Sequence, residues 1–311
     1  MLRYLLKRIL MLLPILLIVS IVAFALVRLV PVDPVESYMS SLHIPMTPEN
    51  TAYISEMLGL DKPILVQYFI WLSDAMRLNF GNSYLDSTPV IDLLKYSLKY
   101  TIELAAGALV WIVVLTFTIA LLSVRKPEGA FDNFGRVITM LGVAVPNFVL
   151  GFILVRCFSL NIRIFPVSGH GTPLHLVLPS FTLAVAYIAT YSRMLRNNML
   201  SNMESRPVSY ARIRGLDEKY IQNKHVLRNA LLPIVGSFGV SFGRLIAGSV
   251  IVENVFAWPG LGRLITLSVL GRDYPVIQGY ILFMAVIFIA ANLISDILCA
   301  AIDPRIRKDV F

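Results

Sequence analysis

Residues 193–233 have the sequence RMLRNNMLSNMESRPVSYARIRGLDEKYIQNKHVLRNALLP. This is the longest polar interruption between apolar segments in the second half of the chain. Eight basic residues recur through it: Arg193, Arg196, Arg206, Arg212, Arg214, Lys219, Lys224 and Arg228. Because basic residues concentrate in the cytoplasmic loops of membrane proteins, the segment is predicted to be a cytoplasmic loop between two membrane spans.

The middle of this loop carries helix start and stop signals. Val208–Ala211 has an amphipathic pattern, and Gly215 follows where a helix would end. Asp217 can cap a second helix that returns toward the membrane at Ala230. We therefore predict a short helix on the cytoplasmic face of the membrane, presented to a soluble partner.

Composition places the chain among integral membrane proteins. Of 311 residues, 57% are hydrophobic and 15% are charged, which is too apolar for a soluble domain of this length. The net charge of +8 comes from basic residues in the predicted cytoplasmic loops. It therefore indicates membrane topology and contact with anionic lipid rather than nucleic-acid binding. Cys157 and Cys299 are expected near opposite faces of the bilayer, too far apart for a disulfide.

Six apolar segments are long enough to cross a bilayer. They lie at about residues 9–30, 100–124, 134–160, 175–195, 229–252 and 276–302. Six spans place both termini inside, and the loops then facing the cytoplasm hold most of the basic residues. The short loops then facing outward hold only Arg163, Arg263 and Arg272. This bias fixes the predicted orientation.

Residues 31–98 form the one sizeable polar segment outside the spans, and we expect a compact helical cap on the outer face. Its prolines punctuate about three short helical patterns. Within it, Leu65, Phe69, Leu72 and Met76 recur at helical spacing. This stripe fits equally a packed spacer and a docking surface.

Polar and proline residues inside spans are the next candidates for function. Arg244 lies well within the fifth span, where a charge is costly. It could meet an anionic group of a transported cargo, or pair with a carboxylate of a neighbouring helix or subunit. Three prolines within spans could kink their helices and leave backbone polar groups free to face a cavity: Pro146, Pro179 and Pro233.

Signatures of enzymes and metal sites lack the required context. Gly239–Gly243 fits G-x-S-x-G, but its flanks form a continuous apolar span rather than a strand and a sharp turn. His170 and His175 lie on a short outer loop without a nearby carboxylate or cysteine, so we expect no metal site. The chain has no phosphate-binding G-x-x-x-x-G-K-[ST] loop. The chain is therefore not predicted to be an enzyme. If it does work, the energy for that work must come from another polypeptide.

Several motifs together resemble one transporter family. They are ARIRGL at Ala211–Leu216, HVLRNALLP at His225–Pro233, ENVFAWPGLG at Glu253–Gly262, DYPVIQ at Asp273–Gln278, DPRIR at Asp303–Arg307, and in the outer segment GLDKP at Gly59–Pro63 and FGNSY at Phe80–Tyr84. This combination is similar to the ABC importer permeases of the dipeptide, oligopeptide and nickel family. The resemblance covers essentially the whole chain.

The resemblance implies an all-α polytopic membrane protein of the type I importer class, in a bacterial inner membrane. It implies a second homologous permease as heterodimer partner, two ATP-binding subunits and an extracytoplasmic solute-binding protein. ATP and magnesium would sit on the ATPase subunits, and this chain would hold no cofactor. The implied domains are a first transmembrane helix at 1–30, the cap at 31–98, a five-helix permease core at 99–302 with a coupling loop at 203–219, and a cytoplasmic tail at 303–311.

The resemblance also places the family's EAA loop in this sequence. Its ATPase-coupling residues would be Pro207, Ser209, Tyr210, Ala211, Arg212, Arg214, Gly215 and Leu216. Only Ala211 and Gly215 match the general motif, because Ser209 and Tyr210 stand in place of its first Glu-Ala. The small side chain of Ala211 would allow the helix and the ATPase to approach closely, and Gly215 would end the helix. The arginines would pair with acidic groups of the ATPase, or alternatively hold anionic lipid.

The cargo is a separate question. Tyr210 and the motif at Glu253–Gly262 look closer to the nickel permease, so we expect transport of nickel or a related metal chelate, with Arg244 as the candidate residue of the translocation path. Di- or oligopeptides are the alternative cargo. An ion-driven secondary transporter and an intramembrane hydrolase are weaker alternatives, since no acidic relay is evident in the spans and Ser241 has no histidine in its own span.

Overall fold

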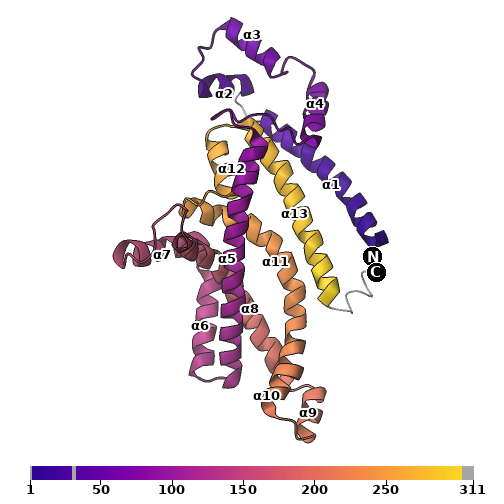
Figure 1. Ribbon diagram of the computed structural model, residues 1–311, viewed down its shortest axis with the longest axis vertical. Helices are drawn as coiled ribbons and strands as arrows, with labels where there is room; N and C mark the ends of the chain where they lie inside the picture. The colour runs from indigo at the N-terminus through magenta and orange to yellow at the C-terminus, as the bar shows by residue number, and fades with distance from the viewer. Residues whose placement is uncertain (1, 30–32, 303–311) are drawn as a thin grey trace. The chain divides into compact units, whose positions relative to one another are not determined.

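The computed structural model describes residues 2–29 and 33–302, without the side chains of residues 2–12, 232, 235–242, 295–296 and 298–302. The predicted tail at 303–311 and the side chains of Ser241, Asp296 and Cys299 thus lie outside the described residues. Within this range the regular elements are all helices, and one isolated bridge joins Asn82 and Pro89. The predicted all-α class is confirmed (Figure 1).

The elements follow one another along the chain as α1 (Leu2–Leu29), α2 (Pro34–Ser41), α3 (Pro48–Met57), α4 (Ile64–Met76), α5 (Val90–Arg125), α6 (Ala130–Ala144), α7 (Asn147–Leu154), η1 (Val155–Asn161), α8 (Pro173–Met203), α9 (Arg206–Ile213), α10 (Glu218–Ile221), η2 (Gln222–Leu227), α11 (Arg228–Val255), α12 (Leu261–Leu270) and α13 (Tyr274–Ile302). The two η segments are π-helical, and each is continuous with a neighbouring α-helix.

Three described helices are long and apolar enough to cross a membrane by themselves: α5, α8 and residues 274–294 of α13. Two bent pairs, α1 with α2 and α6 with the α7–η1 segment, raise the number to five if each is one span. That search covers only the described residues, so the expected six spans stay a prediction. Helix α5 begins at Val90 rather than near Tyr100, so its first turns belong to the segment assigned to the cap.

The predicted span at 134–160 is broken near its middle, at the proline expected to kink it. The chain breaks at Val145 and Pro146, and the helices on either side are bent by 109°. Val145 takes an extended conformation because the ring of the following proline disfavours the helical region for the residue before it. Pro179 and Pro233, by contrast, lie inside the continuous helices α8 and α11.

The described chain divides into two compact units that do not follow chain order. One contains the residues up to Tyr100 together with Pro259–Ala291, and the other contains Thr101–Trp258 with the residues from Asn292 onward. The first unit joins the N-terminal elements to α12 and to α13 as far as Ala291. The second unit holds the basic loop and most of the helices predicted to form the core.

In the first unit, α4 packs on α1 through its aromatic residues. The hydroxyl groups of Tyr68 and Ser20 are hydrogen bonded at 2.8 Å, and the ring of Phe24 meets Tyr68 edge-on at 5.4 Å. The stripe predicted from helical spacing lies on another face, where Leu65 and Phe69 are exposed. The stripe is therefore not an internal packing surface of the described chain.

A buried carboxylate links the loop before α5 to the start of α13. The Ser83 hydroxyl donates to Oδ2 of Asp273 at 2.5 Å, and the backbone N–H of Tyr84 donates to Oδ1 at 3.1 Å. Asp273 is almost fully buried, and this burial raises the pKa of its carboxyl group. The protonated form is therefore favoured in the folded unit more than in the unfolded chain.

In the second unit, a further buried carboxylate joins α5 to α11. The hydroxyl groups of Thr101 and Ser249 both donate to Oε1 of Glu253, each at 2.8 Å. Close helix contact nearby depends on Gly151 of α7, because a Cβ atom there would come within 3.1 Å of Val255 Cγ1. Polar bonds and small residues thus fix the helices of this unit together.

The first prediction concerns Asp273. An Asn at this position can donate to Ser83 and accept from Tyr84, as the protonated carboxyl would, so Asp273→Asn should leave the thermal stability unchanged or raised at pH 7. Asp273→Ala leaves the Ser83 hydroxyl and the Tyr84 N–H without their acceptor and should cost about 1–3 kcal/mol per orphaned donor. Melting of the purified protein in detergent measures both effects.

The pH dependence gives a second readout of the same variants. Because the pKa of Asp273 is raised, the wild type should lose stability relative to Asp273→Asn as pH rises from the ordinary aspartate pKa, about 3.9, through the raised value. Asp61→Asn, in which an exposed carboxylate is changed, is the control. A difference between wild type and Asp273→Asn that stays constant with pH would contradict this assignment.

Candidate functional site

The basic loop folds into α9, a turn and α10, as its start and stop signals predicted. Pro207 lies in the first turn of α9, where its missing N–H would have no helical partner anyway. The helix ends in a Schellman motif: the N–H of Leu216 donates to Ala211 O at 3.2 Å, and that of Gly215 to Arg212 O at 2.9 Å. Gly215 has φ +74°, a conformation that L side chains rarely adopt.

The second helix is capped as expected. One oxygen of the Asp217 side chain accepts from the backbone N–H groups of Lys219 and Tyr220 at 3.0 and 3.3 Å. Helix α10 then continues through η2 directly into α11. The loop is therefore a structured extension of α8 and α11, which pack against each other along their lengths (Figure 1).

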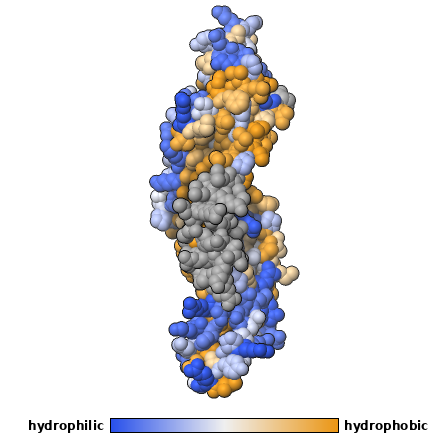
Figure 2. All heavy atoms as spheres, turned by 90° about the vertical axis from the view of Figure 1, so that its right-hand side faces the viewer, coloured by the Kyte–Doolittle hydropathy of each residue, from blue (hydrophilic) through white to orange (hydrophobic). Residues whose placement is uncertain are grey.

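Helix α9 has one face against the rest of the unit and one face free. Val208 and Ala211 are buried, and α9 contacts α8, α10 and η2. Tyr210 and Ile213 are 67% and 80% exposed, and Leu216 is also exposed. Figure 2 shows hydrophilic atoms gathered at the end of the second unit where Figure 1 places α9 and α10, with a small hydrophobic patch at its tip.

The charges around α9 are only partly paired. The guanidinium of Arg212 donates to both carboxylate oxygens of Glu218, at 2.6 and 3.1 Å, and this hydrogen bonding lowers the pKa of Glu218. Both side chains are about half exposed, so water screens the pair and it adds little to stability. Arg214 is exposed and makes no ion pair within the part of the chain that the structure describes.

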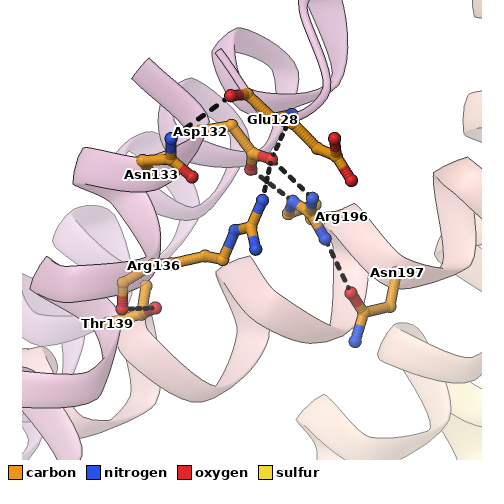
Figure 3. Close-up of polar contacts among 7 residues, drawn as sticks. All are labelled: Glu128, Asp132, Asn133, Arg136, Thr139, Arg196 and Asn197. Carbon is orange, nitrogen blue, oxygen red and sulfur yellow. Dashed lines mark hydrogen bonds and ion pairs between the residues drawn. The ribbon is translucent and has the colours of Figure 1, made fainter. Parts of the chain in front are cut away.

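A buried ion cluster holds α8, the helix that leads into α9, against α6 (Figure 3). Asp132 of α6 has a fully buried side chain and accepts from Nε of Arg196 at 2.5 Å and from its second nitrogen at 2.6 Å. Arg136 donates to the same carboxylate at 3.0 Å, and so does the backbone N–H of Glu128 at 2.9 Å. Both oxygens of this buried carboxylate are thus fully used.

Sequence reasoning missed Asp132. Its spacing of four residues from Arg136 at the start of an apolar helix was a visible signal, because residues at that spacing share a helix face. Its second partner, Arg196, is 64 residues away in the chain. A local sequence pattern cannot predict a pair of residues that far apart in the chain, so only the structure reveals the cluster.

The other predicted residues lie elsewhere. Arg244 is on α11, and its side chain is exposed and makes no ion pair with a carboxylate among the described residues. It lies 16 residues beyond the start of α11 at Arg228, about 24 Å along the helix axis, so it is not brought together with α9. His175 lies in the first turn of α8 rather than on the predicted loop, and its ring shares a hydrogen bond of 2.8 Å with Thr172, the N-cap residue of that helix. Within the described residues, no group of three or more His, Cys, Asp or Glu side chains could hold a metal ion.

Comparison with known proteins gives consistent matches over the whole chain. Residues 112–308 match the family described as "Binding-protein-dependent transport system inner membrane component", and residues 1–105 match the family of the N-terminal part of such membrane components. The glutathione transport system permease protein GsiC of Escherichia coli (strain K12) is 37% identical over 311 residues, covering 99% of each chain. The GsiC protein of Pectobacterium atrosepticum is 38% identical over the same length and coverage.

Solved structures share the fold at lower sequence identity. An inward-facing MetNI methionine ABC transporter chain aligns with a TM-score of 0.55 at 17% identity, covering 68% of this chain and 96% of that one. A chain of an amino acid ABC transporter with histidines aligns with a TM-score of 0.52 at 18% identity, covering 69% and 94%. At these identities the likeness is one of fold.

The second prediction tests the ion cluster beneath α9. Asp132→Ala leaves the guanidinium of Arg196, only 16% exposed, without its partner, and breaking such a pair should cost about 3–5 kcal/mol of unfolding free energy. A clear loss of melting temperature in detergent is expected. Glu128→Gln removes a nearby exposed carboxylate and should change stability by less than about 0.5 kcal/mol. Equal effects of the two substitutions would show that the cluster does not hold α6 and α8 together.

Proposed function

This chain belongs to the family of binding-protein-dependent transport system inner membrane components, and from that premise we propose that α9 is the helix through which it couples to an ATPase. The chain is a permease component of an ABC importer rather than an enzyme. The observation that supports the coupling proposal is that α9 has one buried and one exposed face. Val208 and Ala211 anchor the helix, and Tyr210 and Ile213 are exposed.

The coupling works through rigid contacts. The exposed apolar side chains of α9 would dock in a cleft of the ATPase, while the Schellman turn at Gly215 and the cap at Asp217 fix α9 to α10. Because α10 continues through η2 into α11, and α9 also contacts α8, a displacement of α9 moves two long helices together. Nucleotide-driven closure of the ATPase would thereby reach the helices of the pathway.

From the burial and pairing of the loop residues we infer different roles for some of them. Ala211 was expected to allow close approach, and its small side chain is used against the chain's own helices, since it is buried. Arg212 would have to leave Glu218 before it could pair with the ATPase. Exposed Arg214, unpaired among the described residues, is the better candidate to meet an acidic group there.

The family implies ATPase and substrate-binding partners, and we propose the finer assembly. A second homologous permease would complete a heterodimer, two ATP-binding subunits would carry ATP and magnesium, and an extracytoplasmic solute-binding protein would deliver the cargo. Both termini and α9 would face the cytoplasm, because the basic residues concentrate in the loops on that side.

For the cargo, we propose a short peptide. The similarity to glutathione permeases supports this alternative, because glutathione is itself a small peptide, whereas it gives no specific support for nickel. Arg244 would bind a carboxylate of the cargo, since a guanidinium can hold a carboxylate with two parallel hydrogen bonds. A nickel chelate with carboxylate groups stays the second candidate, because it presents the same chemistry to Arg244.

The third prediction tests docking through α9. Ile213→Glu places a charge on the exposed face and should weaken association with the ATPase subunits about tenfold or more, with the chain still folded. Ile164→Glu, the same change at an exposed residue in the loop after η1, is the matched control. Gly215→Pro should abolish association while membrane insertion persists, since proline cannot adopt φ +74°. Co-purification measures all three, and normal ATPase recovery with both α9 variants would exclude α9 as the coupling helix.

The fourth prediction tests the cargo. After reconstitution with its partner subunits and binding protein, the transporter should show ATP-dependent uptake of glutathione or dipeptides in preference to nickel chelates. Arg244→Gln should reduce this uptake without changing ATPase co-purification, and Arg244→Lys should retain part of it because it keeps the charge. Preference for nickel chelates would overturn the peptide assignment. Uptake driven by an ion gradient without ATP would instead favour a secondary transporter.

A further inference from the structure

A small cavity lies beside the ion cluster, between α5, α6 and α8. Its volume is about 100 Å³. A cavity needs only about 10–15 Å³ of such volume to hold one water molecule, so this one has room for a tetrahedral oxyanion. The side chains that line it and matter for binding are Arg136, Thr139, Ser192, Arg193, Arg196 and Asn197.

Positive charge exceeds negative charge around this cavity. Arg136, Arg193 and Arg196 contribute three guanidinium groups. Two carboxylates oppose them: Asp132, which pairs with Arg136 and Arg196, and Glu128, whose charge acts on Arg196. Arg136 is half exposed and uses one nitrogen on Asp132, so further N–H donors remain. Arg193 is exposed and makes no ion pair in the described part of the chain. The cavity therefore has donors available for an anion.

A second observation points to a ligand independently of charge. Ser192 lines the cavity with a side chain only 1% exposed, and its hydroxyl has no hydrogen-bond partner among the described residues. A buried hydroxyl without a partner is costly, so such groups are rare in folded proteins. Ordinary packing of α8 would be served equally by alanine. A bound oxygen ligand would supply the missing partner.

We propose that this cavity binds a phosphate group, supplied by the headgroup of an anionic phospholipid or by free phosphate. The surroundings favour the lipid. Phe134, Val137, Ile138 and Leu141 are exposed along α6 beside the basic cluster, so acyl chains could follow this helix while the phosphate meets the arginines. The lipid would belong to the leaflet on the side of α9. The site does not depend on the role of α9, and only the naming of that leaflet as the inner one rests on the proposed orientation.

The fifth prediction tests this site on the purified transporter complex in detergent. Phosphatidylglycerol should raise its melting temperature in a saturable manner, and phosphatidylcholine should not. Arg193→Gln should weaken the apparent affinity for phosphatidylglycerol about tenfold, because it removes a charged hydrogen-bond donor. Arg125→Gln makes the same change at an exposed arginine at the end of α5, outside the cavity, and should leave the affinity within about twofold of wild type.

A second arm separates the two sources of phosphate. If inorganic phosphate at millimolar concentration competes with the lipid, the cavity accepts free phosphate; if it does not, the site requires the lipid. Ser192→Ala should weaken binding while leaving the melting temperature without ligand unchanged or higher, since it removes an unpaired buried hydroxyl. A hydroxyl with a purely structural role would lower that temperature.

The outcomes are decisive in both directions. Equal affinities of wild type and Arg193→Gln for phosphatidylglycerol, or equal stabilisation by phosphatidylcholine, would overturn the proposal. Arg125→Gln weakening binding as much as Arg193→Gln would reduce the effect to general attraction of anionic lipid to basic loops. Because the readout is lipid binding, its failure leaves the coupling test on α9 untouched.

Discussion

The carboxylate of Asp132 is the constraint on which the organisation of the second unit depends. A buried charge is stable only when its hydrogen-bonding capacity is met, and here two arginines and one backbone N–H meet it. The pairing fixes the start of α6 to α8 two turns before α8 ends. Since α8 leads directly to α9, the position of the proposed coupling helix follows from this cluster.

The same unit indicates how the proposed coupling helix could receive force from a partner. Helix α9 is joined to α8 through a short turn and to α11 through α10 and η2, and it buries only Val208 and Ala211. In the proposed coupling, its exposed residues would contact the ATPase and its anchored residues would transmit the displacement. Polar bonds elsewhere, such as those of Thr101 and Ser249 to Glu253, keep the long helices from sliding independently.

Local features of the candidate site could be predicted well from sequence. The helix at Val208, the stop at Gly215 and the cap at Asp217 are all observed, because each depends on residues within a few positions of one another. The break at Pro146 was foreseen only as a kink, and its size of 109° was not. A proline removes one N–H and restricts its predecessor, but the packing of both flanking helices sets the angle between them.

The amino-acid sequence by itself determined the membrane class, the helical fold, the family and the position of the polar loop. Composition, periodicity and short motifs suffice for these features, since they arise from local preference and from the low polarity of the bilayer. Only the tertiary structure decided that Asp132 meets Arg196, that Ala211 is buried while Ile213 is free, and that Ser192 borders a basic cavity. Those features depend on contacts between residues far apart in the chain. The sequence of one helix does not specify which neighbouring helix it will contact.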